Sequence, residues 1–278
     1  MEFGWLESLM LGIVAGLTEL LPVSALAHNR LLMKFMGRGE APALMLLCIH
    51  LGILAAVFLS CQPHILKILR AKSMARIPKR KRKRPLDTKS LMDYSLWQTM
   101  ILPVILALLL SAQANSLASN FIIMATFLFL NGLILYIPQF LPSSNKDCRS
   151  LSRVEGLLMG LGGSLFVIPG FSGTGAALSI ASITGVERKY AVSMVLLMQL
   201  VVLAGRVVQD IAALFVGTLG QLSLLLVLRY ILAGMAAFAA ALAAVKLLRS
   251  LAEGKGFSLF AYYSWGMALF TFILSLMA

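Results

Sequence analysis

Two apolar stretches of the chain are broken in the same way, by a proline with a serine close behind it. The first, residues 16–28, reads GLTELLPVSALAH, and the second, residues 167–177, reads VIPGFSGTGAA. Proline removes a backbone donor from a helix, and lipid offers no partner for the groups that are freed. Broken helices at membrane depth therefore occur where protein or a wet cavity surrounds them. Two matching breaks predict a binding site at the centre of a pseudo-symmetric membrane protein.

An acid and a histidine lie on either side of the first break. Glu19 is in an apolar stretch, so we expect it to face a cavity as a general base or as a ligand for Mg²⁺ or Ca²⁺. The alternative is a carboxylate satisfied by the free backbone amides at the break. His28 can act as a general acid or as a nucleophile toward a phosphoryl group, because imidazole titrates near neutral pH. A polar role at the membrane interface is equally compatible with this histidine.

Hydroxyls and glycines near the breaks could bind an anion. Ser24 and Ser172 each follow a broken apolar run, and their hydroxyls could form a phosphate nest with amides of the glycine-rich turn. Capping of backbone groups is the alternative role of both serines, and close helix packing is the alternative role of the glycines. We predict a catalytic set of Glu19, His28, Ser24 and Ser172, and a phosphate-binding set of Ser24, Ser172, Gly173, Thr174, Gly175 and Arg206.

Three polar residues within predicted spans have simpler and sharper interpretations. Arg206 lies four residues before Asp210, and the simpler interpretation is an i,i+4 ion pair at the interface. The sharper hypothesis is that Arg206 or Arg30 brings positive charge to the phosphate site. We expect His50 and Gln199 to form hydrogen bonds between helices, with cavity lining as the alternative.

Composition and charge place the chain in the membrane. The chain has 278 residues, of which 60% are hydrophobic and only 13% are charged, so the fold class is an all-α polytopic membrane protein. The formal charge of +13 could suggest nucleic-acid binding, but much of it is concentrated in residues 67–89. A basic loop between spans is a topology signal and attracts anionic lipid headgroups. We therefore expect no nucleic-acid partner.

Hydropathy divides the chain into two similar halves. Apolar segments long enough to span a bilayer lie at about 42–61, 95–112, 118–137, 190–207, 222–248 and 257–277. The broken regions, about 6–37 and 151–185, are predicted to be re-entrant helical hairpins. The order of hairpin and three spans occurs twice, which predicts an inverted repeat with halves 1–150 and 151–278. A short echo, Gly12-x3-Gly16 in the first half and Gly156-x3-Gly160 in the second, supports the duplication.

The basic loops give an independent check on topology. If the loop 62–94 is cytoplasmic, the basic loops near 138–153, 186–189 and 246–256 fall on the same side. This agrees with the positive-inside rule. The same assignment places both termini outside, with the first hairpin entering from outside and the second from the cytoplasm.

The two broken motifs resemble those of the bacterial undecaprenyl-diphosphate phosphatases, the integral-membrane bacitracin-resistance family. The family's segments E-G-L-T-E-F-L-P-V-S-S-T-G-H and P-G-F-S-R-S-G-A-T correspond here to residues 15–28 and 169–177. The likeness continues through IHLG at 49–52 and TGVERKYA at 184–191. The resemblance implies a multi-pass protein of the bacterial inner membrane with an outward-facing pocket and a polyprenyl diphosphate substrate. It also implies release of phosphate during carrier-lipid recycling for cell-wall synthesis, and we expect a homodimer.

Departures from the family pattern keep two functions open. The family's first glutamate is Ala15 here, its arginine is Gly173, and its closing threonine is Ala177. The family's Ser-Thr-Gly before the histidine is Ala25-Leu26-Ala27. One hypothesis is a membrane diphosphatase, in which Glu19 and a divalent ion assist phosphoryl transfer. The other is a non-hydrolytic lipid-phosphate transporter or flippase, because inverted repeats with broken helices are common in transporters. A paralogue with a vestigial cavity is a third, weaker hypothesis.

Overall fold

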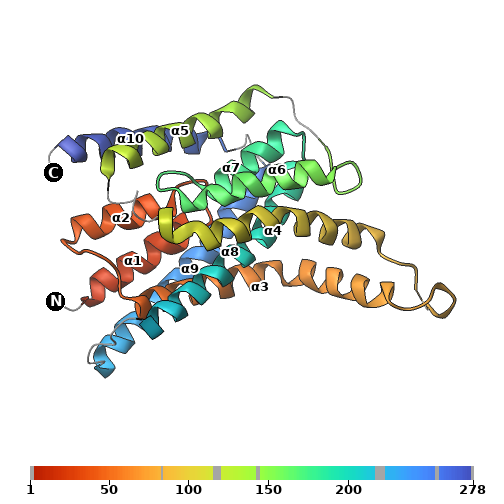
Figure 1. The fold of residues 1–278 in the computed structure, drawn as a ribbon, viewed down its shortest axis with the longest axis horizontal. Coiled ribbons are helices and arrows are strands. Elements are labelled where there is room, and N and C mark those ends of the chain that lie inside the picture. The colour runs from red at the N-terminus through yellow and green to blue at the C-terminus, as the bar shows by residue number, and fades with distance from the viewer. Residues whose placement is uncertain are drawn as a thin grey trace.

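The chain folds into a bundle of helices of very different lengths (Figure 1). The computed structural model describes all residues except 1–2, 83, 115–119, 142–144, 217–222, 254–256 and 277–278. Ten α-helices and no β-strand are found in the described part. Their bounds are α1 Trp5–Thr18, α2 Ala25–Phe35, α3 Ala43–Ala75, α4 Thr88–Ala114, α5 Phe121–Tyr136, α6 Arg153–Ser164, α7 Gly173–Ile183, α8 Arg188–Val216, α9 Leu224–Glu253 and α10 Leu259–Leu276.

Six of these helices, α3, α4, α5, α8, α9 and α10, are long and apolar enough to cross a membrane. The chain is therefore a multi-pass membrane protein, which confirms the all-α polytopic class. Each predicted span overlaps one of the six helices. The predicted span ends at 118, 222 and 277 lie outside the described residues.

The predicted loop 62–94 was wrong in its extent. Helix α3 continues past Pro63 to Ala75, and α4 already begins at Thr88, so the connection is only residues 76–87. Ile68 and Ala71 keep α3 packed against the core, and the Asp87 carboxylate accepts the Ser90 amide at the start of α4. Hydropathy marks where lipid ends, whereas packing and capping decide where a helix ends. Helix α8 likewise extends to Val216, beyond the predicted end at 207.

Both broken regions form the predicted helical hairpins, α1–α2 and α6–α7. In the first, α1 ends before Pro22, and the Ser24 hydroxyl caps α2 by accepting the Ala27 amide at 3.3 Å. In the second, Gly170 has φ of 104°, a conformation that glycine adopts readily, and Ser172 caps α7. Proline and an N-cap serine are thus the local cause of both breaks.

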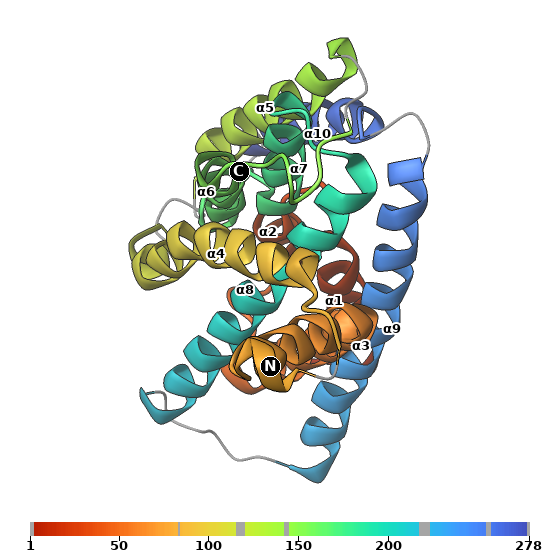
Figure 2. The same ribbon diagram turned by 90° about the vertical axis from the view of Figure 1, so that its right-hand side faces the viewer.

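Glycines of the two similar motifs, Gly12-x3-Gly16 and Gly156-x3-Gly160, allow the backbones of neighbouring helices to touch. Gly12 of α1 lies against the backbone of Ala233 in α9, where an added Cβ would overlap the carbonyl oxygen. Gly160 of α6 lies in the same way against the Met100 carbonyl of α4. Figure 2 shows α9 along one side of the molecule, with α1 and α3 against it. The helix pairs α1–α9 and α4–α6 correspond under a duplication, while the inverted repeat itself stays a prediction.

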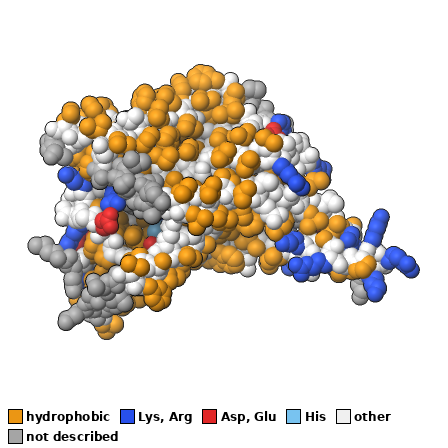
Figure 3. Space-filling view, in the orientation of Figure 1, with side chains coloured by type: hydrophobic (Ala, Val, Ile, Leu, Met, Phe, Trp, Pro, Cys, Tyr) orange, Lys and Arg blue, Asp and Glu red, His pale blue; other side chains and the backbone are white. Residues whose placement is uncertain are grey.

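The molecule has two distinct ends. Helices α3 and α4 extend side by side to the connection 76–87, and Lys and Arg side chains gather over this tip, which we call the basic end (Figures 1 and 3). Two other predicted basic loops contact each other, because Lys146 and Val186 form an isolated β-bridge. Arg249 of α9 donates to the Ser60 carbonyl of α3 at 2.7 Å. The N-terminus and the α2–α3 connection lie at the opposite end (Figure 1).

Candidate functional site

The two hairpin breaks meet in the interior. The Gly170 amide donates to Ser24 Oγ at 3.0 Å, and Ser172 Oγ donates to the Leu21 carbonyl at 3.3 Å. Ser24 is fully buried and Ser172 is 3% exposed. Each serine therefore caps its own helix and also joins the two hairpins. Capping, one of the two roles considered for these serines, is what both hydroxyls do in this structure.

Next to this crossing, Glu19 forms an ion pair with Arg206 of α8. Glu19 Oε1 lies 3.3 Å from Arg206 Nε, and the two side chains are 5% and 20% exposed. The expected pair between Arg206 and Asp210 was wrong, because Asp210 binds His50 instead. A buried carboxylate needs a countercharge, and Arg206 provides it from the neighbouring helix. Arg30, the other arginine considered for the site, pairs with the exposed Glu40 at 3.0 Å.

Hydrogen bonds connect Glu19 to α7 and α8. Gln199 Nε2 lies 2.5 Å from Thr174 Oγ1 and 3.3 Å from the Glu19 carbonyl, so its predicted hydrogen bonding between helices is confirmed. The Thr174 hydroxyl also donates to the Glu19 carbonyl at 3.4 Å. Gln199 is 2% exposed, and its Oε1 has no hydrogen-bond partner in the described part of the chain. Thr174, Gln199 and Arg206 thus surround the end of α1.

The first turn of α7 carries two amide donors that no described group accepts. Ser172 accepts the Gly175 amide through Oγ and the Ala176 amide through its carbonyl. The amides of Gly173 and Thr174 have no hydrogen-bond acceptor among the residues that the structure describes. Free amides at a helix N-terminus attract anions. Of the predicted nest, the Gly175 amide is therefore occupied, whereas those of Gly173 and Thr174, both in buried residues, have no described acceptor.

Position 173 has no room for a side chain. A Cβ at Gly173 would overlap the Gly163 carbonyl oxygen and the Cβ of Phe166. The ring of Phe166 in turn faces the Arg206 guanidinium, whose central carbon lies 5.3 Å from the ring centroid. Phe166 therefore contacts both Gly173 and Arg206.

His28 is held on the other side of α2. Its Nδ1 lies 2.6 Å from the Ser24 carbonyl and its Nε2 lies 2.6 Å from the Tyr263 hydroxyl of α10. A carbonyl only accepts, so Nδ1 carries the proton and Nε2 of the neutral ring accepts from Tyr263. Both nitrogens are engaged, and neither contacts Glu19 or Arg206. Among the described residues, the hydrogen bonds of the His28 ring connect it to the site through Ser24.

Two further polar contacts lie near the site, and the sequence predicts only one of them. His50 Nδ1 of α3 lies 2.5 Å from Asp210 Oδ2, one turn along α8 from Arg206, so the predicted hydrogen bonding of His50 between helices is confirmed. Asn131 of α5, which was not predicted, accepts the Ser172 amide at 2.9 Å through Oδ1 and holds the second break in place. Asn131 is the one amide side chain in the apolar run FIIMATFLFLNGLILY, and this amide is the signal that could have identified it.

The residues around Glu19 do not by themselves form a cation site. No group of three or more His, Cys, Asp and Glu side chains placed to hold a metal occurs in the described segments. Glu19 is the carboxylate of this cluster, and a cationic guanidinium lies beside it. Mg²⁺ commonly binds one or two carboxylates together with substrate phosphate oxygens. A divalent ion would therefore need ligands from a bound diphosphate.

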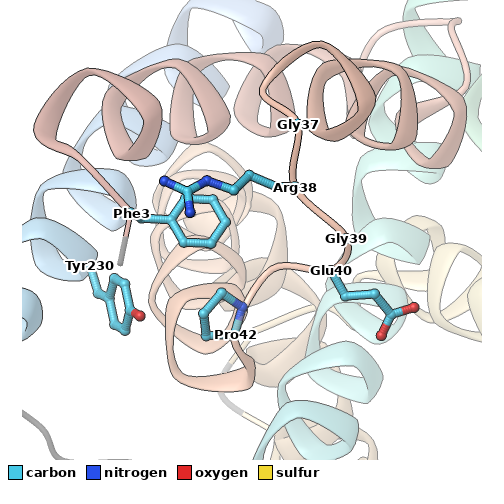
Figure 4. A pocket seen from close by; sticks show the side chains of 7 residues that line it. All are labelled: Phe3, Gly37, Arg38, Gly39, Glu40, Pro42 and Tyr230. Carbon is cyan, nitrogen blue, oxygen red and sulfur yellow. The ribbon is translucent and has the colours of Figure 1, made fainter. Parts of the chain in front are cut away.

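An open pocket of about 650 Å³ lies at the opposite end, between the α2–α3 connection and α9 (Figure 4). The Arg38 guanidinium covers the Phe3 ring on one wall, and Tyr230 and Pro42 form the other walls. The predicted site residues are not among those that line it. Figure 3 shows this end of the molecule recessed, with acidic and histidine side chains in the recess.

Comparison with known proteins identifies the family. The model of the family described as "Bacitracin resistance protein BacA" matches residues 8–270. The chain belongs to this family. An undecaprenyl-diphosphatase from Methanobrevibacter smithii is 29% identical over 275 residues, which are 96% of each chain. Proteins of the same name from Carboxydothermus hydrogenoformans and Desulfatibacillum aliphaticivorans are 29% and 26% identical, over 93% and 94% of this chain and 93% and 95% of theirs.

Membership confirms the resemblance seen in the two broken motifs. The family match covers both hairpins and nearly all of the six spans, so it includes Glu19, the two capping serines and Arg206. Within the family's motifs, this chain has Gly173 where the resemblance leads one to expect arginine. The ion pair between Glu19 and Arg206 accordingly places a guanidinium close to that position from a different helix.

Proposed function

We propose that this protein binds the headgroup of a polyprenyl diphosphate, such as undecaprenyl diphosphate, where its two hairpins cross, and hydrolyses the phosphoanhydride bond. The observation that carries the proposal is the ion pair between Glu19 and Arg206 beside the free amides of α7. Phosphoryl transfer needs positively charged groups beside the phosphate oxygens, and a water molecule or nucleophile in position to attack phosphorus. This cluster offers an arginine, two amides and a carboxylate for these tasks.

Arg206 supplies the charge that Gly173 does not. Its contact with Phe166 brings the guanidinium next to the residue against which Gly173 is packed. The side chain is 20% exposed, so an anion can reach it, while Glu19 behind it is 5% exposed. Arg206 Nε lies 3.3 Å from Glu19 Oε1 but has no hydrogen-bond partner among the described residues, so the pair is held by charge. No hydrogen bond from the terminal nitrogens of Arg206 to a described residue is found either. Arginine can donate two parallel hydrogen bonds to a phosphate through such nitrogens.

Glu19 acts as the general base in this mechanism. A water molecule attacks the terminal phosphorus while Glu19 accepts its proton, and the bond to the bridging oxygen breaks. The products are inorganic phosphate and the polyprenyl monophosphate. The amides of Gly173 and Thr174 donate to the phosphate oxygens, as expected for a helix N-terminus. Mg²⁺ or Ca²⁺, arriving with the substrate, supplies further charge neutralisation when bound.

The serines and the histidine of the predicted catalytic set act as positioning residues here. Ser24 and Ser172 hold the hairpins together through Gly170 and Leu21. Ser172 Oγ already donates to a carbonyl, so it is not free to attack phosphorus in this arrangement. His28 supports the crossing by its bond to the Ser24 carbonyl.

We further propose that the protein lies in the bacterial inner membrane with the basic end in the cytoplasm. Lys and Arg concentrate at that end, as the positive-inside rule expects. The site would then be reached from the outer face. We also propose that the protein forms a homodimer.

Measuring phosphate release and lipid movement separately tests the function. Purified protein in liposomes is given undecaprenyl diphosphate with Mg²⁺ or Ca²⁺. Arg206→Ala and Glu19→Gln should each lower phosphate release by about 10²–10³-fold, as for other losses of a single transition-state group. Arg206→Lys should restore part of the rate. Arg30→Ala is the matched control, because Arg30 pairs at the surface with Glu40 and should leave the rate unchanged.

Two results would contradict hydrolysis at this site. Transbilayer movement of the lipid without phosphate release would favour the transporter, for which the contact of two broken hairpins in the interior is the supporting observation. Equal rates for wild type and Arg206→Ala would remove Arg206 from the mechanism.

A further inference from the structure

A second polar cavity, of about 560 Å³, lies near the basic end of the molecule. It is formed between the later part of α3, the start of α4, the start of α8 and the end of α9. Three cationic side chains line it, from Lys67 of α3, Lys89 of α4 and Arg249 of α9. This cavity shares no lining residue with the cluster around Glu19. We call it the basic-end pocket.

The carboxylates of the basic-end pocket are already satisfied by neighbouring groups. Asp93 is 4% exposed, accepts the Tyr190 hydroxyl at 2.8 Å and lies 3.1 Å from His64 Nε2. Asp87 accepts the amide and the hydroxyl of Ser90 at 3.1 and 2.7 Å, and these bonds are the main reason that the pKa of Asp87 is lowered. Neither acid needs a cation from the cavity.

The Lys and Arg side chains of the basic-end pocket, in contrast, retain N–H groups that can donate hydrogen bonds to a ligand. The ammonium groups of Lys67 and Lys89 form no hydrogen bond or ion pair with any residue that the structure describes, although Lys67 acts on Asp87 through space. Arg249 uses one terminal nitrogen on the Ser60 carbonyl. Three side chains of Lys and Arg face two carboxylates, so these five groups give the cavity an excess of one positive charge. An anion with several acceptor oxygens would complete this arrangement.

We propose that the basic-end pocket binds the phosphate group of an anionic phospholipid. Basic pockets between spans on the cytoplasmic side are suited to such headgroups. A volume of about 560 Å³ is large enough for a headgroup. The helices that line the cavity also expose leucines, Leu66 and Leu69 on α3 and Leu247 on α9, against which acyl chains can lie. Free inorganic phosphate has the same recognising chemistry and is separated from the lipid by the experiment.

Thermal unfolding of the full chain tests the proposal. The midpoint is measured in nanodiscs of phosphatidylcholine with and without phosphatidylglycerol, and, in a separate arm, with inorganic phosphate. The pocket variant is Lys67→Gln with Lys89→Gln. The matched control is Lys79→Gln with Lys81→Gln, which removes the same charge from exposed positions of the short 3₁₀ turn in the α3–α4 connection. Native mass spectrometry counts the phosphatidylglycerol molecules retained by each variant.

We expect phosphatidylglycerol to raise the midpoint of the wild type and of the control. The pocket variant should bind it about tenfold more weakly. A shift with inorganic phosphate alone, lost in the pocket variant, would support the same site with free phosphate as its ligand. Equal losses in both variants would overturn the proposal, because they would show diffuse attraction to the basic end. No preference of the wild type for phosphatidylglycerol or phosphate would overturn it as well. None of these outcomes depends on phosphate release at Glu19.

Discussion

The Ser24 hydroxyl accepts a hydrogen bond from the Gly170 amide at 3.0 Å. This bond joins the N-cap of α2, in the first hairpin, to the turn of the second hairpin. The hydroxyl also caps α2 through the Ala27 amide. Two buried donors thus depend on one oxygen atom, and the proposed phosphate site depends on the position of both hairpins.

Replacing Ser24 tests how much this bond contributes. Ser24→Ala leaves the Gly170 and Ala27 amides without an acceptor, and we expect it to lower the free energy of unfolding by about 1–3 kcal/mol. Ser24→Thr keeps the oxygen and should cost less. Thermal unfolding in one detergent compares the two variants. Equal midpoints for Ser24→Ala and wild type would show that the amides find other acceptors.

His50 and Asp210 form a buried pair, and we expect removal of one partner to cost more stability than replacement of both. Both residues are 8% exposed, and the two atoms lie 2.5 Å apart. Asp210→Ala leaves a buried imidazole unpaired and should lower stability by about 3 kcal/mol. The double variant His50→Gln with Asp210→Asn should recover part of this loss, since two amides can hydrogen-bond. A loss of stability in the double variant that exceeds the sum of the losses in His50→Gln alone and Asp210→Asn alone would contradict the pairing. Thermal unfolding measures each of these variants.

We expect replacement of glycine by alanine to have opposite effects on stability at two positions. Gly12→Ala places a methyl group on the Ala233 carbonyl and should destabilise the protein by about 1–3 kcal/mol. Gly266 in α10 has open space where a methyl group would lie, and Gly266→Ala should stabilise by about 0.5–1 kcal/mol through helix propensity. Unfolding midpoints of the two variants provide the measurement. An unchanged or raised midpoint for Gly12→Ala would argue against the close contact of α1 and α9.

The reactivity of Cys148 reports on Asp93, one of the residues that line the basic-end pocket. Burial, together with the Asp93 carboxylate beside it, raises the pKa of Cys148 to about 11. The thiol is protonated below that pKa, so its thiolate fraction at pH 8 is about one in a thousand. In a Cys48→Ser, Cys61→Ser background, alkylation should accelerate about tenfold per pH unit between pH 8 and 10.

Asp93→Asn is the informative partner variant for this measurement. Removing the carboxylate removes one of the groups that raise the pKa of Cys148, so alkylation at a given pH should become faster. If the alkylation rate in the Cys48→Ser, Cys61→Ser background with Asp93 intact levels off near pH 9, the raised pKa of Cys148 is contradicted.

The sequence by itself determined the membrane class, the two hairpins and the family. Each depends on local information: apolar length, a proline with a following cap residue, and motifs of adjacent residues. The polar residues that gather at the crossing could also be named, because a charged or amide side chain in an apolar run is costly without a role.

Only the tertiary structure decided which of these residues meet. Arg206 could pair with Asp210 on its own helix or with a residue far away in the chain, and helix packing placed it on Glu19. The lengths of α3 and α4 likewise depended on packing and capping beyond the apolar segments. Spacing along a chain determines which side chains share a helix face, whereas the partner of that face is set by how the helices pack.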